Sequence, residues 1–248
     1  MKHTSLFITK TLIFFITVCS FAQSEVQQKD SVVIKQRYGL RMGTDLGKII
    51  KTLIESDYEG LEFNFDYRLT KNLYLAGDFG NETRVTDDSE FLNVTTEGNY
   101  IKLGIDYNVY SNWLDMDNLI YAGFRIGYSD FEQKLNSFTV YNTDQYWQEP
   151  FSNDVGKTFT GLSASWAELQ VGLKAELVRN LYMGLNIQFK ARIHDDDPEN
   201  FENVYIPGFN KTYDSGSFGI GFGYNIQYLI PFYKKAKNQK AKDSEKEN

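Results

Sequence analysis

The sequence predicts an all-β protein, an antiparallel up-and-down transmembrane β-barrel of about eight strands. Three observations predict this fold class: an N-terminal export signal, segments in which apolar and polar residues alternate, and connections that are alternately short and long. Each observation alone fits other proteins, because soluble antiparallel sheets also alternate and also have hairpins. Together they are typical of barrels in the outer membrane of Gram-negative bacteria.

Residues 1–22 have the features of a signal peptide. Basic residues precede an apolar run at 12–18, and a small-x-small site favours cleavage after Ala22. The run is shorter than the roughly 20 apolar residues that a membrane-spanning helix needs. A lipoprotein signal at Cys19 is the alternative, although Val18 stands before it where such signals have a small residue. We expect a mature chain without cysteine and therefore without a disulfide.

Alternation with a period of two is clearest at residues 60–68. Aromatic and aliphatic side chains there point to one face, while Glu62, Asn64 and Asp66 point to the other. Further segments repeat the pattern and give about eight strands, an even number that can close antiparallel. The apolar positions of these segments lie at 38–42, 61–67, 73–79, 101–109, 120–128, 167–177, 181–189 and 218–228.

The connections between these segments alternate in length. Those at 69–72, 111–118 and 178–180 are short, whereas those at 81–97, 129–161 and 194–214 are long. Short periplasmic turns and long outer loops are the bacterial barrel pattern. We divide the chain accordingly into a signal peptide (1–22), a periplasmic N-terminal stretch (23–35), an outer-membrane β-barrel domain (36–233) and a disordered charged periplasmic tail (234–248).

Residues 48–54 break the strand rhythm. Ile50, Leu53 and Ile54 match one face of a helix better than alternate positions of a strand. This spacing predicts a short interfacial helix in the first outer loop. A ragged strand end is the alternative.

Alternation does not tell which face of the barrel lines its interior. Glycines fall mainly on the polar face, and a crowded, curved interior needs small residues where a solvated exterior would favour Lys, Glu or Thr. We therefore predict that the polar face lines the lumen and the apolar face meets lipid. A soluble lipocalin-like barrel with the faces reversed is the alternative. On the first assignment, we expect Leu103→Arg to cost far more stability than Lys102→Leu.

The predicted lumen face carries both charge signs in nearly equal numbers. Side chains of opposite charge in a narrow barrel pair and fill it, because unpaired charge removed from water is costly. We therefore expect a closed lumen without an aqueous channel. The predicted lumen charge network consists of Arg37, Arg41, Glu62, Asp66, Arg68, Asp78, Lys102, Asp106, Arg125, Glu168, Lys174, Glu176, Lys190 and Arg192.

The connection at 129–161 interleaves aromatic and polar residues. Aromatic rings stack on sugars and anchor protein partners, so a surface binding site is one interpretation. The other, which continuing alternation favours, is that the two flanking strands extend outward and the rings pack the extension. The candidate surface-binding rings are Phe131, Phe138, Tyr141, Tyr146, Trp147 and Phe151.

The one histidine of the predicted mature chain, His194, precedes a run of carboxylates. A base beside carboxylates could serve a membrane hydrolase or acyltransferase, but no serine or cysteine nucleophile is identifiable beside it. The acidic run at 195–202 does not have EF-hand spacing, and we interpret it as a charged loop, bridged by cations to lipopolysaccharide, in preference to a discrete metal site. We predict no catalytic residue, no metal site and no cofactor.

Three stretches carry a resemblance to a known family. They are RLTKNLYLA at 68–76, YIPGFNK at 205–211 and YLIPFY at 228–233. Through them the chain resembles a family of Bacteroidota outer-membrane β-barrels of unknown function. The resemblance covers nearly the whole predicted mature chain. It implies the barrel and the outer-membrane address, but it brings no catalytic residues to carry over.

A net charge of -7 and a pI near 5.0 give no basic surface, so nucleic acid is an unfavourable partner. We expect a non-enzymatic envelope protein whose closed barrel displays outer loops or steadies the membrane. Its expected partners are outer-membrane lipid, lipopolysaccharide and, during biogenesis, the barrel-assembly machinery. The alternatives are a small-solute or gated channel, suggested by the charged lumen, and a membrane-embedded enzyme that acts on lipid or lipopolysaccharide.

Overall fold

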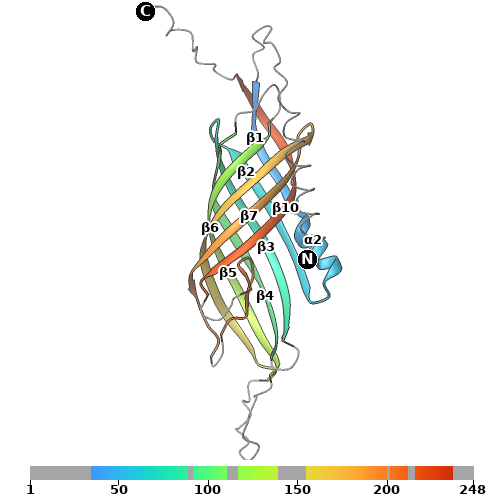
Figure 1. The fold of residues 1–248 in the computed structure, drawn as a ribbon, viewed down its shortest axis with the longest axis vertical. Coiled ribbons are helices and arrows are strands. Elements are labelled where there is room, and N and C mark those ends of the chain that lie inside the picture. The colour runs from blue at the N-terminus through green and yellow to red at the C-terminus, as the bar shows by residue number, and fades with distance from the viewer. Residues whose placement is uncertain are drawn as a thin grey trace, which may run out of the picture. The chain divides into compact units, whose positions relative to one another are not determined.

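The computed structural model describes residues 35–88, 92–110, 117–138, 155–199, 202–211 and 216–236. They form a closed antiparallel barrel, one short helix and a separate two-stranded hairpin (Figure 1). The predicted signal peptide, most of the N-terminal stretch and most of the charged tail lie outside the described residues. The elements are β1 (Lys35–Asp45), α2 (Leu46–Ile54), β2 (Tyr58–Arg68), β3 (Leu73–Asp88), β4 (Leu92–Asn108), β5 (Leu119–Phe138), β6 (Thr158–Val178), β7 (Leu181–Asp195), β8 (Tyr205–Ile206), β9 (Asn210–Lys211) and β10 (Phe218–Ala236).

The barrel closes by pairing of its first and last strands. Around the wall the order is β1-β10-β7-β6-β5-β4-β3-β2, and all neighbours are antiparallel. Along β1, the pairs with β10 run from Lys35↔Ala236 to Asp45↔Asn225. Closure gives each strand two neighbours and so removes the free edges of an open sheet. The predicted fold class, an eight-stranded up-and-down barrel with a short helix after the first strand, is confirmed.

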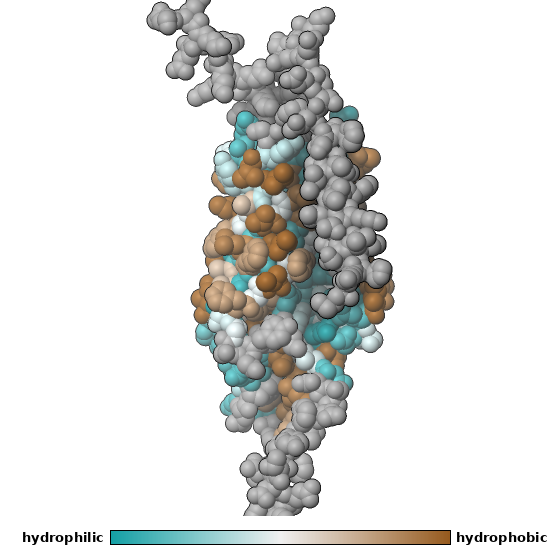
Figure 2. Space-filling model, viewed as in Figure 1, coloured by the Kyte–Doolittle hydropathy of each residue, from teal (hydrophilic) through white to brown (hydrophobic). Residues whose placement is uncertain are grey.

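The outer wall of the barrel is apolar over its middle. On each strand, apolar side chains point outward and polar or charged ones point inward, where they are buried. Figure 2 shows hydrophobic residues gathered over the middle of the visible wall. We call this surface the apolar belt; its outward residues are Met42, Leu61, Phe63, Leu75, Phe79, Ile101, Leu103, Ile105, Ile120, Phe124, Ile126, Leu169, Val171, Leu173, Leu185, Ile187, Phe189, Ile220 and Phe222.

The polarity of the wall reverses at the end of the barrel with the long connections. On β3 the outward residue that follows Phe79 is the exposed Asn81, and on β5 the one that follows Tyr128 is the exposed Asp130. Inside the same part of the barrel the side chains become apolar. We call this cluster the outer core; it contains Val94, Tyr100, Phe131, Leu135, Phe159, Leu162, Ala164, Trp166, Ile206 and Phe209.

The outer core decides the role of one candidate surface ring. Phe131 is 2% exposed and lies inside the barrel, so it packs the strand extension and is not available for surface binding. Phe138 is partly buried against the same cluster. The other candidate rings, Tyr141, Tyr146, Trp147 and Phe151, lie outside the described residues.

Helix α2 begins where β1 ends. The carboxylate of Asp45 accepts a hydrogen bond from the backbone N–H of Lys48 at 3.0 Å, so Asp45 is the N-cap that turns the strand into a helix. The helix therefore starts two residues earlier than the predicted segment. Ile50, Leu53 and Ile54 on its apolar face are exposed. Within the described part of the chain, no helix is long and apolar enough to cross a membrane.

Candidate functional site: the filled lumen and its plug

The lumen is crossed by an unbroken chain of ion pairs. It begins between β1 and β2, where Arg41 Nε lies 2.6 Å from Asp66 Oδ1. Lys174 of β6 reaches the other oxygen of the same carboxylate at 2.6 Å. The next links range from 2.7 Å, between Arg125 and Asp106, to 3.8 Å, between Arg125 and Asp78, and the charge alternates in sign at each step. We call it the lumen chain; its order is Arg41, Asp66, Lys174, Asp106, Arg125, Asp78, Lys102, Glu62, Lys48 and Glu82.

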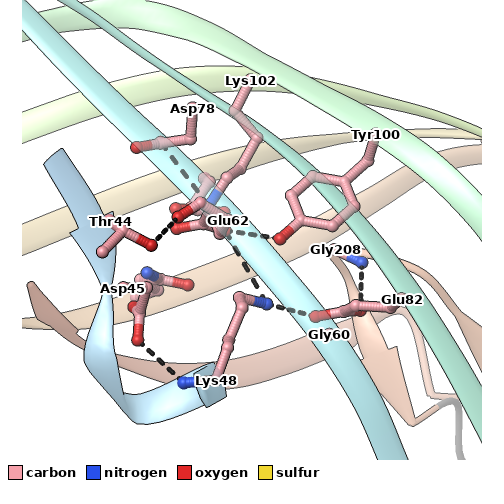
Figure 3. A network of polar contacts seen from close by, with 12 residues as sticks. Thr44, Asp45, Lys48, Gly60, Glu62, Asp78, Glu82, Tyr100, Lys102 and Gly208 are labelled. Atoms are coloured by element: carbon pink, nitrogen blue, oxygen red, sulfur yellow. Dashed lines mark hydrogen bonds and ion pairs between the residues drawn. The ribbon is translucent and has the colours of Figure 1, made fainter. Parts of the chain in front are cut away.

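The outer half of the lumen chain is drawn in Figure 3. Lys102 stands between two carboxylates, with its Nζ 3.2 Å from Glu62 Oε2 and 3.5 Å from Asp78 Oδ2. The hydroxyl of Tyr100 donates to the same oxygen of Glu62 at 2.6 Å. Lys48 reaches in from helix α2 and pairs with both Glu62 and Glu82. Each of these carboxylates therefore has a cation beside it, which offsets the cost of burying it.

Strand register and glycines make this arrangement fit. Arg41 is directly opposite Asp66 and Lys102 directly opposite Asp78, so neighbouring strands supply opposite charges at one level. A Cβ at Gly123 would lie 2.3 Å from Asp106 Oδ1, so only glycine leaves room for the carboxylate there. A cavity among these side chains has a volume of about 20 Å³. That is space for about one water molecule and not for a channel.

The remaining predicted lumen charges lie outside the chain. Arg37 pairs with Glu176 at 2.5 Å beside the β6–β7 turn, and Arg68 lies 3.2 Å from Asp117. In the outer half, Lys190 is 4.0 Å from Glu168. Arg192 is half-buried and pairs with Asp195 at 2.8 Å.

Sequence reasoning missed the outer end of the lumen chain. Lys48 escaped because it comes from a helix and not from an alternating strand. Glu82 escaped because its segment was predicted to be a loop, whereas β3 continues to Asp88. Asp117, the partner of Arg68, was also missed because it lies in the β4–β5 connection and not on a strand. Only for Glu82 was a signal present, since it continues the inward phase of Asp78 by two steps of two residues.

Residues 202–211 fold back into the mouth of the barrel. We call this segment the plug hairpin; it contains β8 and β9 and was predicted to be part of a long outer loop. Ile206 is 0% exposed and Phe209 1% exposed, and the ring of Phe209 meets the ring of Trp166 edge-on at 5.9 Å between centroids. Gly208, at φ 78°, lies against the ring of Tyr100, where a Cβ would approach to 2.5 Å. The plug hairpin therefore closes the outer end of the lumen by packing into the outer core.

Glu82 joins the plug hairpin to the lumen chain. Its Oε2 accepts hydrogen bonds from the Tyr205 hydroxyl at 2.7 Å and from the Gly208 N–H at 2.8 Å. Its Oε1 accepts one from the Tyr58 hydroxyl at 2.9 Å and pairs with Lys48. Figure 3 shows Glu82 between Lys48 and Gly208. The plug is thus held by a charged acceptor, and hydrogen bonds to ionised groups are the stronger kind.

His194 does not form a catalytic pair with a nucleophile. Its Nε2 lies 3.3 Å from Asp196 Oδ1, and the hydroxyl of Ser163 donates to the other oxygen of that carboxylate at 2.6 Å. The carboxylate thus lies between the ring and the hydroxyl, whereas a general base must touch the proton that it removes.

The acidic run beside His194 is engaged in local contacts. Asp195 pairs with Arg192, Asp196 bonds Ser163, and Asp197 accepts from the backbone and side chain of Asn203. Lys157 lies 3.6 Å from Glu199. Among the described residues, no group of three or more acidic, histidine or cysteine side chains is arranged to hold a metal ion.

Comparison with known proteins gives the family of the chain. Residues 4–235 match the model of a family described as a domain of unknown function, DUF6048. The chain belongs to the DUF6048 family. No curated protein sequence matches it. Among solved structures, the DUF6048 chain is similar to Ail, the attachment invasion locus protein of Yersinia pestis, with a TM-score of 0.39 and 7% identity over 79% of this chain and 99% of Ail.

In this DUF6048 chain the acidity of Glu82 follows from its contacts. Burial disfavours the carboxylate and raises its pKa, but the charge of Lys48 and the hydrogen bonds from Lys48, Gly208 and Tyr205 outweigh burial. Together they lower the pKa of Glu82 to about 2. Glu82 lies beyond the outer edge of the apolar belt, which ends on β3 at Phe79. A carboxyl group with a lowered pKa in the folded state stabilises that state above its unfolded pKa of about 4.3, and the stabilisation is lost as the pH falls toward 2.

We predict that Glu82→Gln loosens the plug hairpin. Loss of charged hydrogen bonds should speed amide exchange in residues 202–211 about tenfold or more, since each such bond contributes about 1.5 to 3 kcal/mol. Hydrogen–deuterium exchange read by mass spectrometry measures this. The exposed Glu97→Gln on β4 is the matched control and should leave the segment protected. Acidification of the wild type should loosen the segment progressively below about pH 4.3, and near pH 2 it should have the same effect as Glu82→Gln. Unchanged protection in both cases would show that Glu82 does not hold the plug.

Proposed function

We propose that the chain is an outer-membrane β-barrel protein of a Gram-negative cell envelope, non-enzymatic, with a closed ion-paired lumen and outer loops in a structural or binding role. The observation that carries the proposal is the reversal of polarity along the wall. Over the apolar belt, apolar residues face outward and charges face inward; beyond it, Asn81 and Asp130 face outward and the outer core lies inside. A bilayer against the belt and water against the extension account for both halves.

The belt favours lipid over water as its surroundings. Soluble monomers seldom expose a contiguous apolar surface of this extent, because its contact with water is unfavourable. A closed barrel is also one of the two structures that satisfy every backbone hydrogen bond within a bilayer. The soluble lipocalin-like alternative would place the charged face outward, whereas Arg41, Lys102 and Asp106 are at most 3% exposed.

The filled lumen favours a role in displaying the outer loops or in supporting the membrane, and not a role in transport. Among the described residues, paired charges of the lumen chain and the packed plug hairpin occupy the lumen, which supports a closed barrel. We predict that the protein, reconstituted in planar bilayers, gives no reproducible single-channel steps. Reproducible steps would overturn the closed barrel and favour the channel alternative, in which the plug hairpin and the charged side chains move apart.

An enzyme acting on lipid or lipopolysaccharide is the second alternative. Its one candidate base is His194, whose partner is a carboxylate and not a nucleophile. Lipid-A profiles of a deletion strain should equal those of the parent strain. A changed profile that wild-type protein restores and His194→Ala does not would favour the enzyme.

The proposal extends to targeting and surroundings. We propose cleavage of the signal peptide near Ala22, an N-terminal stretch to residue 35 and a tail from 234 in the periplasm, and an origin in Bacteroidota. The proposed partners are outer-membrane lipid, lipopolysaccharide and, during biogenesis, the barrel-assembly machinery. Alternating hydrophobicity and export features support the targeting and the membrane surroundings, and the family resemblance supports the origin. N-terminal sequencing of the protein recovered from membranes tests the cleavage position.

A further inference from the structure

The barrel wall has a gap where β1 turns into a helix. The pairing of β1 ends at Asp45↔Asn225 on one side and Thr44↔Phe63 on the other. Among the described residues, 218–224 of β10 then pair with β7 alone, and 58–62 of β2 pair with β3 alone. Helix α2 takes up part of the space that a longer β1 would fill. We call the remaining opening, of about 810 Å³ between α2, β10 and the β2–β3 hairpin, the wall notch.

The β10 side of the wall notch is apolar and unusually open. Phe218 is 81% exposed and Phe222 77%, compared with 42% for Ile187 and 50% for Phe189 on the neighbouring strand. On the other flank, Leu53 and Ile54 of α2 are 79% and 77% exposed. These four side chains are the most exposed large apolar ones in the described residues. For Phe218 and Phe222 the described residues place no paired strand on the side where β1 has ended, which accounts for their exposure.

The wall notch is continuous with the apolar belt. Ile220 is directly opposite Phe189, and Phe222 is directly opposite Ile187, both of which belong to the belt. Gly219 and Gly221 alternate with these residues and also line the notch. A Cβ at Gly219 would lie 3.4 Å from the Phe209 ring, so the inward side of the strand is in contact with the plug hairpin. The notch is therefore a recess of the surface that, on our proposal, faces lipid.

The opposite end of the wall notch is ionic and lies beyond the belt. Arg84 is occupied by two carboxylates, Glu55 at 2.6 Å and Asp57 at 2.9 Å. Lys51 has only a long contact to Glu55, at 3.9 Å, with its Nζ 4.1 Å above the ring of Tyr58. Its side chain is 39% exposed. Lys51 can therefore accept an additional anion. On our proposal it lies at the level where the lipid headgroups begin.

We infer that the wall notch binds one phosphate-bearing lipid of the surrounding membrane. Its acyl chains lie against Phe218, Ile220 and Phe222, and its phosphate lies beside Lys51. The inference rests on the proposed membrane location and adds a specific site to it. The recess gives acyl chains more contact with apolar side chains than the flat belt does, and these packing contacts supply most of the binding. The open edge of β10 could instead pair with a second copy of this chain, and the experiment separates that occupant from lipid.

The test is native mass spectrometry of the full-length mature protein folded in detergent and titrated with phosphatidylglycerol. We expect one bound lipid per wild-type chain. Phe218→Ser with Phe222→Ser should weaken binding about tenfold or more, since each aromatic loses much of its buried area. The matched control, Phe124→Ser with Tyr128→Ser on β5, the strand opposite β1 in the barrel, should leave binding unchanged. Lys51→Gln should weaken binding of phosphatidylglycerol severalfold but not that of diacylglycerol with the same chains.

The outcomes are distinct. Equal binding by the notch and control variants overturns the site, and so does a dimer that replaces the lipid complex. If the notch variant misfolds, Ile220→Ser alone replaces it, because Ile220 is 62% exposed on the same outward face of β10, and it should likewise weaken lipid binding. Insertion into vesicles is measured on the same samples. Failure of the wild type to insert refutes the membrane proposal, whereas insertion without selective lipid binding refutes only this inference.

Discussion

The substitution Leu103→Arg should lower the stability of the barrel in a bilayer by about 2 to 4 kcal/mol. Leu103 is 51% exposed and faces outward in the middle of the apolar belt, between Gly77 of β3 and Ile126 of β5. A guanidinium at that position must leave water for hydrocarbon, and this is costly for a charge at the bilayer midplane. Reversible urea unfolding of the protein folded into thin lipid vesicles measures the difference.

The control for this prediction is Glu97→Arg. Glu97 is exposed on the same strand and the same outward face, but it lies beyond the belt. It is also directly opposite Glu132, so arginine there removes a pair of like charges. We expect a change within about 0.5 kcal/mol, as for ordinary surface substitutions. Equal effects of the two arginines would mean that lipid does not contact the belt.

The substitution Lys102→Met should lower the free energy of unfolding by about 3 to 5 kcal/mol. Lys102 is 1% exposed and is the cation between Glu62 and Asp78. Its removal leaves buried carboxylates short of a partner, and an uncompensated buried charge is more destabilising than a lost surface pair. The measurement is the same unfolding experiment. Lys134→Met on β5, an exposed lysine, is the control and should change stability little.

A second substitution shows whether unpaired charge is the cause. Asp78→Asn in the Lys102→Met background removes one of the two stranded carboxylates, so the double variant should recover part of the lost stability. The alternative is that Asp78→Asn lowers the free energy of unfolding by the same amount in the wild type and in Lys102→Met. The two residues would then be uncoupled, and the lumen chain would not act as a unit. From these contacts we expect the loss of stability at Lys102 to be at least as large as that at Leu103, whereas the sequence alone predicts the larger loss at Leu103; the unfolding experiment decides between the two.

Alternation was enough to predict the barrel because each strand has one apolar and one polar face. In the belt part of β5, apolar residues occupy the outward positions from Ile120 to Tyr128. Beyond it the phase changes, and Phe131 and Leu135 occupy the inward positions instead. When only the outward face is followed, the run of apolar residues ends at this point, and the sequence then predicts a loop. The extensions of β3 to β6 were therefore underestimated.

Contacts between segments that are far apart in the chain could not be predicted from the sequence. Lys174 and Asp66 are 108 residues apart, and no local pattern selects that pair from the other charges on the lumen face. The plug hairpin illustrates the same limit. Its Gly208 indicates a turn, but insertion depends on Tyr100 and Glu82, which come from other strands. The turn at Asn180, which adopts φ 69°, is in contrast a local feature that the sequence predicts.

The central claim is that this barrel spans the outer membrane with its long connections outside, and cell fractionation followed by protease shaving tests it most directly. We predict that the chain is recovered in the outer-membrane fraction of a Gram-negative host. A protease of broad specificity added to intact cells should cut in the long connections, such as 139–154, and spare the turns at 69–72 and 178–180. Recovery in the soluble periplasmic fraction, or cuts confined to those short turns, would contradict the account.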